Sequence, residues 1–211
     1  MNDVEQARAY SEADFHEPHQ AFVDMFRARF RQFADRPFRA VDLGCGAADV
    51  TVRFARAHSW ATVVGVDGAD AMLEHGRARI AAAGLEERIE LMTRRLPDPG
   101  VCAMKFDVAF SNSLLHHIND PQVLWDTISQ CTVEDGAVFV MDLCRPSDDR
   151  AVEKLVDTYA RDEPPVLKRD FRASLRAAYR PDEVRGQLAS ADLRLAVEQV
   201  TDRHIVAWGS R

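Results

Sequence analysis

The order of apolar and amphipathic segments between residues 38 and 144 constrains the fold more than any other feature of the sequence. Short apolar runs alternate there with stretches of helical periodicity. We expect strands at 38–44, 61–68, 88–96, 106–113 and 136–144, and helices at 49–58, 69–84 and 120–132. Because the strands are almost continuously apolar, the pattern predicts a parallel sheet covered by helices on both faces.

Residues 38–145 form the expected core, and the segments on either side of it complete a single domain. Phenylalanines at helical spacing in 21–33 predict a helical cap within residues 1–36. Residues 146–180 are charged and read as about two helices interrupted by a Pro-Pro pair. Because long insertions at the ligand edge of a rigid sheet commonly carry function, we expect this segment to form a lid.

Residues 181–211 are expected to close the domain with a helix at 181–193 and strands at 193–200 and 203–209. The short connection between these two strands requires an antiparallel pair. The predicted fold class is therefore α/β, a doubly wound sheet of seven strands that is mostly parallel, with an antiparallel C-terminal strand and a helical lid insertion.

Composition narrows the range of partners. The formal net charge of −7 over 211 residues argues against a nucleic acid as binding partner. No apolar run approaches the roughly 20 residues that a membrane span needs, and the polar N-terminus does not resemble a signal peptide. The four cysteines form no Cys-x-x-Cys pair, which favours reduced thiols and a cytoplasmic location. His16 and His19 have ligand-pair spacing but no third ligand, so no metal site is expected.

The stretch VDLGCGAADVTVRFAR, Val41 to Arg56, carries the strongest functional signal. Gly44 and Gly46 follow the first strand at the sheet edge where ligands bind, and a missing side chain lets a ligand approach the backbone. Asp67 ends the second strand at the position that holds ribose hydroxyls in nucleotide sites. Asp49 stands where a dinucleotide fingerprint has its third glycine. Its charge would repel a pyrophosphate, which favours a cofactor with a cationic or zwitterionic tail.

The motifs VDLGCGAADVT, VVGVDGADAML and FDVAFSNSLLHHINDP together resemble those of the class I S-adenosylmethionine-dependent methyltransferases, in the branch that acts on small molecules. The resemblance spans about residues 38–145. It implies a Rossmann-like fold and S-adenosylmethionine as cofactor, released as S-adenosylhomocysteine. The residues that it assigns to the cofactor are Asp42, Gly44, Gly46, Asp67, Gly68, Met72, Leu96 and Ser111. Family members often have an acid after the third strand, near the adenine, where this chain has Arg94 and Arg95.

The acceptor side is less constrained. Methyl transfer needs alignment and, for a protonated acceptor, a base. The catalytic candidates are His116, because histidine as a residue type can exchange a proton near neutral pH, Tyr10 from an N-terminal segment that folds over the cofactor in related enzymes, and Asn112 at the end of the fourth strand. The candidates for substrate binding are Asp142, Arg145, Tyr159 and Arg169. For each of these except Asn112, a structural or surface role is a competing interpretation.

We therefore expect methyl transfer from S-adenosylmethionine to an N, O or S nucleophile of a small molecule by in-line displacement. The basic residues of the lid favour an acceptor with an anionic group. Three alternatives stay open: a nucleic-acid or protein methyltransferase, a non-catalytic S-adenosylmethionine- or S-adenosylhomocysteine-binding protein, and a nucleotide-binding oxidoreductase. The residues SNSLLHH, 111–117, lack the Asn-Pro-Pro-Tyr type of motif that grips a flipped base. The sequence leaves both a monomer and a homodimer open.

Overall fold

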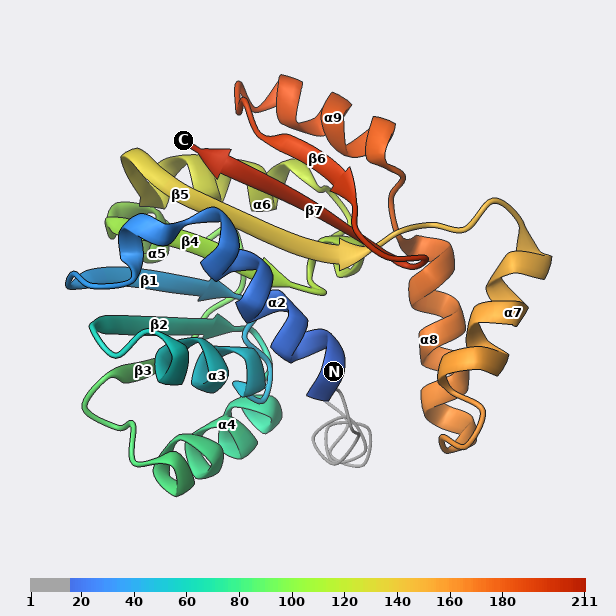
Figure 1. Ribbon diagram of the computed structural model, residues 1–211, viewed down its shortest axis with the longest axis horizontal. Helices are drawn as coiled ribbons and strands as arrows, with labels where there is room; N and C mark the ends of the chain where they lie inside the picture. Colours follow the sequence, from blue (N-terminus) through green and yellow to red (C-terminus); the bar gives the residue numbers. More distant parts are fainter. Residues whose placement is uncertain (1–15) are drawn as a thin grey trace.

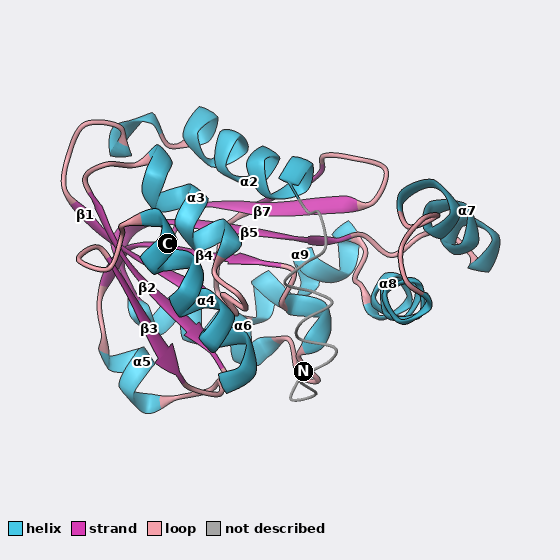
Figure 2. Cartoon of the chain, turned by 90° about the horizontal axis from the view of Figure 1, so that it is seen from below, coloured by secondary structure: helices cyan, strands magenta, loops and turns pink. Residues whose placement is uncertain are grey.

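A seven-stranded sheet lies between two layers of helices in the computed structural model, which describes residues 16–211 (Figures 1 and 2). The strand order is β3-β2-β1-β4-β5-β7-β6. The strands are β1 (Phe38–Leu43), β2 (Ala61–Asp67), β3 (Ile89–Thr93), β4 (Phe106–Asn112), β5 (Thr132–Leu143), β6 (Ala196–Gln199) and β7 (His204–Ser210). Strands β1 to β5 pair in parallel, and β7 runs antiparallel to both β5 and β6. The predicted fold class is confirmed.

Helices cover both faces of the sheet (Figure 2). They are α2 (His16–Arg29), α3 (Asp49–Ala57), α4 (Asp70–Ala83), α5 (Pro99–Ala103), α6 (Gln122–Cys131), α7 (Asp149–Tyr159), α8 (Pro165–Ala177) and α9 (Pro181–Ser190), with 3₁₀ turns η1 (Arg31–Phe33) and η2 (Leu115–His117). Helices α2, α3 and α4 share one hydrophobic core, and α5, α6 and α9 share the core on the opposite face. Among the described residues, no helix is long and apolar enough to cross a membrane.

Aromatic packing builds the first of these cores. The Phe54 ring stacks on Phe110 of β4 with centroids 4.4 Å apart, and Phe26 of α2 meets Phe54 edge-on at 4.9 Å. All three side chains are fully buried. Aromatic pairs of this kind add to the area that they bury. Helix α2 is therefore anchored on the sheet, close to the start of α3.

Several element boundaries differ from the prediction. Helix α2 begins at His16 rather than at residue 21, because Pro18 lies in its first turn, where a missing amide costs nothing. The short elements α5 and η2 were not predicted, since each is too brief to show a period. At the start of α3, Ala48 occupies the N-cap and Asp49 is the first helical residue.

Helices α7 and α8 form a hairpin beyond the carboxyl end of β5 (Figure 1). Val152, Leu155 and Leu175 form a small core of their own with Leu143, the last residue of β5. Arg172 of α8 donates two hydrogen bonds to a carboxylate of α7, at 2.6 and 2.8 Å. Helix α8 also contacts η2, which directly follows β4. The segment expected to form the lid therefore lies at the same sheet edge as the glycine turn.

Candidate functional site

The turn after β1 follows a left-handed backbone path at three residues. Gly44, Gly46 and Ala48 have φ values of 77°, 53° and 57°. The amides of Gly44 and Cys45 both donate to the carbonyl of Val66, at 2.8 and 3.1 Å, which folds the turn against the end of β2. Glycine adopts such φ values at little cost, whereas an L-residue is strained. Ala48 therefore occupies a position whose backbone conformation suits glycine better than alanine.

The two glycines of the turn differ in what surrounds them. A Cβ atom on Gly44 would lie 2.8 Å from the side chain of Leu114, so the glycine makes room for the loop that follows β4. A Cβ on Gly46 would meet only the terminal methyl of Met72, at 3.3 Å. Gly46 is therefore the glycine that leaves the backbone open to a ligand, and Met72 packs beneath it.

Asp67 links the glycine turn to the loop after β2. Its Oδ2 accepts a hydrogen bond from the Gly46 amide at 2.9 Å, and its Oδ1 accepts one from the Ala69 amide at 2.8 Å. The side chain is half-buried. Because each carboxylate oxygen has a second lone pair, Asp67 can still accept from a pair of hydroxyl groups. Its assignment to the ribose stays a prediction that this geometry supports.

Asp42 lies underneath the turn and not at its surface. The residue is 1% exposed, and its Oδ2 accepts a hydrogen bond from the Thr51 hydroxyl of α3 at 2.6 Å. Burial raises the pKa of Asp42 to about 7, the Thr51 hydrogen bond opposes that rise, and the charge of Asp67 adds to it. Asp42 thus joins β1 to α3 and orders the turn from within.

A cavity of about 400 Å³ opens beside Asp67, at the carboxyl ends of β2 and β3. Its lining residues are Gly68, Asp70, Ala71, Thr93, Arg94 and Arg95. Leu96 does not line this cavity and instead packs, partly buried, against the core under α5 and α6. Gly68 borders this cavity, and its contact with the adenine, which the resemblance implies, stays a prediction.

The carboxylate of Asp49 lies among three basic side chains. It lies 2.7 Å from Nδ1 of His19 and 2.8 Å from Nε of Arg53, and Arg79 lies 3.8 Å away. Burial raises the pKa of Asp49, but the hydrogen bonds from His19 and Arg53 outweigh that effect and hold it well below the ordinary value. The two arginines offset the charge of this carboxylate, and repulsion of a pyrophosphate by Asp49 stays a prediction.

Two candidate site residues at the end of β4, Ser111 and Asn112, differ in their hydrogen bonds. The fully buried Ser111 donates its hydroxyl to the Leu43 carbonyl of β1 at 2.7 Å, so this side chain belongs to the sheet. Asn112 is half-buried, and its side-chain amide makes no hydrogen bond with the described part of the chain. Asn112 therefore keeps donors and an acceptor for a ligand. Tyr10, the third catalytic candidate, lies outside the described residues.

His116 and Asp142 form a buried pair across two neighbouring strand ends. Nδ1 of His116 lies 2.5 Å from Oδ1 of Asp142, and each side chain is 3% exposed. The Asp142 carboxylate also accepts the amide of Leu143 at 2.6 Å on Oδ1 and the amide of Leu115 at 2.7 Å on Oδ2. Asp142 was expected to contact the substrate, but here its oxygens hold His116 and η2 in place.

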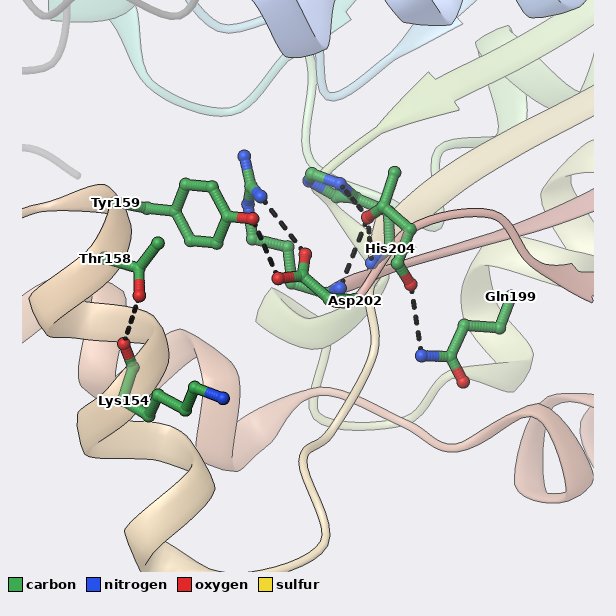
Figure 3. A network of polar contacts seen from close by, with 8 residues as sticks. Lys154, Thr158, Tyr159, Gln199, Asp202 and His204 are labelled. Carbon is green, nitrogen blue, oxygen red and sulfur yellow. Dashed lines mark hydrogen bonds and ion pairs between the residues drawn. The ribbon is translucent and has the colours of Figure 1, made fainter.

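The other acceptor candidates also have partners within the protein. Arg145 forms an ion pair with Glu183 at the start of α9. The Tyr159 hydroxyl at the end of α7 donates to Asp202 at 2.8 Å, in the turn between β6 and β7 (Figure 3). Arg169 is 72% exposed and bonds its neighbour Asp170. Tyr159 therefore ties the hairpin to the sheet, and Arg169 points to solvent; their contact with an acceptor stays a prediction.

Comparison with known proteins shows which methyltransferases this chain is similar to. Residues 40–136 match the model of the methyltransferase domain family. An uncharacterized methyltransferase of Mycobacterium tuberculosis is 30% identical over 108 residues, which cover 51% of each chain. A polyketide synthase of Burkholderia thailandensis, ThaQ, is 29% identical over 124 residues, 57% of this chain and 6% of the synthase. This chain thus spans about half of the mycobacterial relative and a small part of the synthase.

Among solved structures, the plantazolicin methyltransferase BpumL in complex with SAH superposes with a TM-score of 0.76 over 98% of this chain and 90% of that one, at 11% identity. The sheet order and the glycine turn are those of the class I S-adenosylmethionine-dependent methyltransferase fold, and residues 40–136, slightly less than half of the chain, match the methyltransferase domain family. The resemblance inferred from the motifs is confirmed. S-adenosylmethionine is the cofactor of this class, and the open backbone at Gly46, the spare lone pairs of Asp67 and the adjacent cavity fit it.

Proposed function

We propose that this chain transfers the methyl group of S-adenosylmethionine to an N–H or O–H group of a small molecule, with His116 as the general base. The observation that carries this proposal is the buried His116–Asp142 pair, which directly follows β4 at the ligand edge of the sheet. Leu114, two residues earlier, packs on Gly44 and joins the pair to the glycine turn. A titratable group with a fixed orientation beside a cofactor turn is what proton removal requires.

The Asp142 carboxylate determines which nitrogen of His116 is basic. With no proton of its own, Asp142 accepts a hydrogen bond from Nδ1–H, so the lone pair of the neutral ring is at Nε2. The described residues offer Nε2 no hydrogen-bond partner. Nε2 takes the acceptor's proton, and the negative charge of Asp142 balances the imidazolium. Bound S-adenosylmethionine supplies a methyl group on a sulfonium whose leaving group is neutral, so no acid is needed on that side.

Five residues position the reactants. Gly46 leaves the backbone open for the methionine part of the cofactor, and Asp67 accepts hydrogen bonds from its ribose. Asp42 and Thr51 keep the turn in shape from below. Asn112, with its amide unsatisfied by the described residues at the end of β4, orients the acceptor. Such alignment accounts for a large share of the rate in a displacement reaction.

Burial of the base supports a small acceptor. The His116 side chain is 3% exposed, and α8 packs on η2. An acceptor therefore reaches the base only when α8 or η2 moves. A small molecule can be enclosed in this way, and enclosure keeps water from the reaction. The names of the similar proteins, a polyketide synthase and a plantazolicin methyltransferase, support the same acceptor class.

Isotope transfer tests this proposal. The protein is incubated with S-adenosylmethionine labelled in its methyl group and with a cell extract separated into metabolite, protein and nucleic-acid fractions. We expect label in the metabolite fraction together with release of S-adenosylhomocysteine. His116→Asn should reduce that release about 100-fold or more, whereas His117→Asn, which changes the exposed neighbour, should reduce it less than threefold. Label confined to protein or nucleic acid, or equal effects of the two variants, would contradict the proposal.

A further inference from the structure

The arginine pair after β3 borders the cavity beside Asp67, and its two members are held differently. Arg94 donates from Nη1 to the Thr93 carbonyl at 2.8 Å, and its Nε lies 3.8 Å from a carboxylate oxygen of Asp98. Arg95 makes no hydrogen bond or ion pair with the described part of the chain. One guanidinium at the cavity is therefore fixed, and the other is available to a ligand.

The stem of Arg95 crosses Gly68. A Cβ atom on Gly68 would lie 2.9 Å from Cγ and 3.7 Å from Nε of Arg95. The absence of a side chain at residue 68 thus lets the arginine lie along the backbone that directly follows Asp67. This path holds the guanidinium over the cavity although the residue itself is exposed.

Apart from the two arginines, the described groups that line the cavity include no planar side chain that could stack on the base of a nucleoside. Asp70 accepts the Thr93 hydroxyl at 2.7 Å, and Ala71 offers only a methyl group. None of the described residues that line the cavity is aromatic. A nucleoside whose ribose is held by Asp67 extends its base past Gly68, so a planar cation above Gly68 faces the ring. Guanidinium groups stack on aromatic rings through their planar, weakly hydrated face.

We propose that Arg95 stacks on the adenine ring of the cofactor and is the residue of this chain that holds the base. The inference rests on S-adenosylmethionine binding at the proposed site and adds the group that recognises its purine. Arg94 remains bound to Thr93 and Asp98 and does not contribute.

Calorimetric titration with S-adenosylhomocysteine and, separately, with adenosine tests this role without any turnover. Arg95→Ala should weaken both ligands to a similar degree, about three- to thirtyfold, the range of a cation–π contact. Arg94→Ala, the matched control, should change either affinity less than twofold. Arg95→Lys keeps the charge but lacks the planar group, so it should recover only a minor part of the loss.

Four results with the variants would overturn the stacking role. They are an Arg95→Ala affinity within twofold of wild type, equal losses in the Arg94 and Arg95 variants, full recovery by lysine, and a loss for S-adenosylhomocysteine but not for adenosine. The last result would place Arg95 on the methionine part of the ligand. Failure of the wild type to bind either ligand would overturn this role as well. Binding without methyl transfer to any acceptor would contradict the proposed function and leave the role of Arg95 standing.

Discussion

Replacing Asp142 with asparagine changes the hydrogen bonds around His116 in a way that the geometry defines. In the wild type, Oδ1 accepts from His116 and from the Leu143 amide, and Oδ2 accepts from the Leu115 amide. An asparagine has one acceptor oxygen and one NH₂ group, so one backbone donor must face the NH₂. Either orientation therefore leaves a buried amide unsatisfied, which costs about 1–3 kcal/mol of unfolding free energy.

The orientation of the asparagine also determines whether a base survives. If its NH₂ group faces His116, Nδ1 must accept, the proton moves to Nε2, and the ring can no longer take a proton from the acceptor. If its oxygen faces His116, the tautomer is kept but the negative charge that stabilises the imidazolium is lost. In both cases we expect kcat/KM to fall about 10²- to 10⁴-fold, which is the usual worth of general base catalysis.

The assay for Asp142→Asn combines release of S-adenosylhomocysteine with nitrogen NMR of the His116 ring, which reports its tautomer. Affinity for S-adenosylhomocysteine should stay within twofold of wild type, because Asp142 does not touch the glycine turn. Asp107→Asn is a matched control, since Asp107 accepts the Arg39 amide at 2.8 Å at the opposite end of β4 and should leave the rate unchanged. A rate for Asp142→Asn within threefold of wild type would refute the reasoning.

Three further outcomes follow from the structure. Asp67→Ala removes a charged acceptor and should weaken the affinity for S-adenosylhomocysteine, measured by calorimetry, about ten- to hundredfold. Asp70→Ala, at the neighbouring cavity, should reduce this affinity much less. Near-equal losses of affinity would place the ribose elsewhere. Tyr159→Phe deletes the hydrogen bond to Asp202, so hydrogen exchange in α7 should speed up while cofactor affinity stays intact, and unchanged exchange would mean that this bond does not hold the hairpin. Burial raises the pKa of Asp42 to about 7, so the unfolded state binds fewer protons than the folded state between pH 4 and 7. The free energy of unfolding of the wild type should therefore fall with rising pH, relative to that of Asp42→Asn, by roughly 1–4 kcal/mol. Parallel profiles of unfolding free energy against pH would show that Asp42 ionises normally.

The architecture could be predicted because it depends on patterns that the chain repeats. The apolar runs that become β1, β2 and β4 are bounded by turn residues, and Gly84 ends α4 in the left-handed conformation expected of a C-cap. The positions of Gly46 and Asp67 also follow from sequence, since both are set by the ends of single strands.

The acceptor side could not be predicted to the same depth, because its partners lie on different elements. Asp142 and His116 are 26 residues apart, and only the pairing of β4 with β5 brings them together. Two acids or histidines at the ends of strands that adjoin in a doubly wound sheet would have been the available signal. The attachment of Tyr159 to Asp202 depends on the β6–β7 turn, whose position relative to α7 no local pattern encodes.

The most direct test of the whole account is calorimetric titration of S-adenosylhomocysteine into wild type and into Gly46→Val, with Gly84→Val as the control. Both glycines have positive φ values, 53° and 65°, so valine strains the two backbones alike, but a Cβ on Gly84 meets nothing within 4 Å. We predict that wild type and Gly84→Val bind, and that Gly46→Val loses binding while circular dichroism shows an unchanged helical content. Equal affinity of Gly46→Val and Gly84→Val would contradict a cofactor site at this turn.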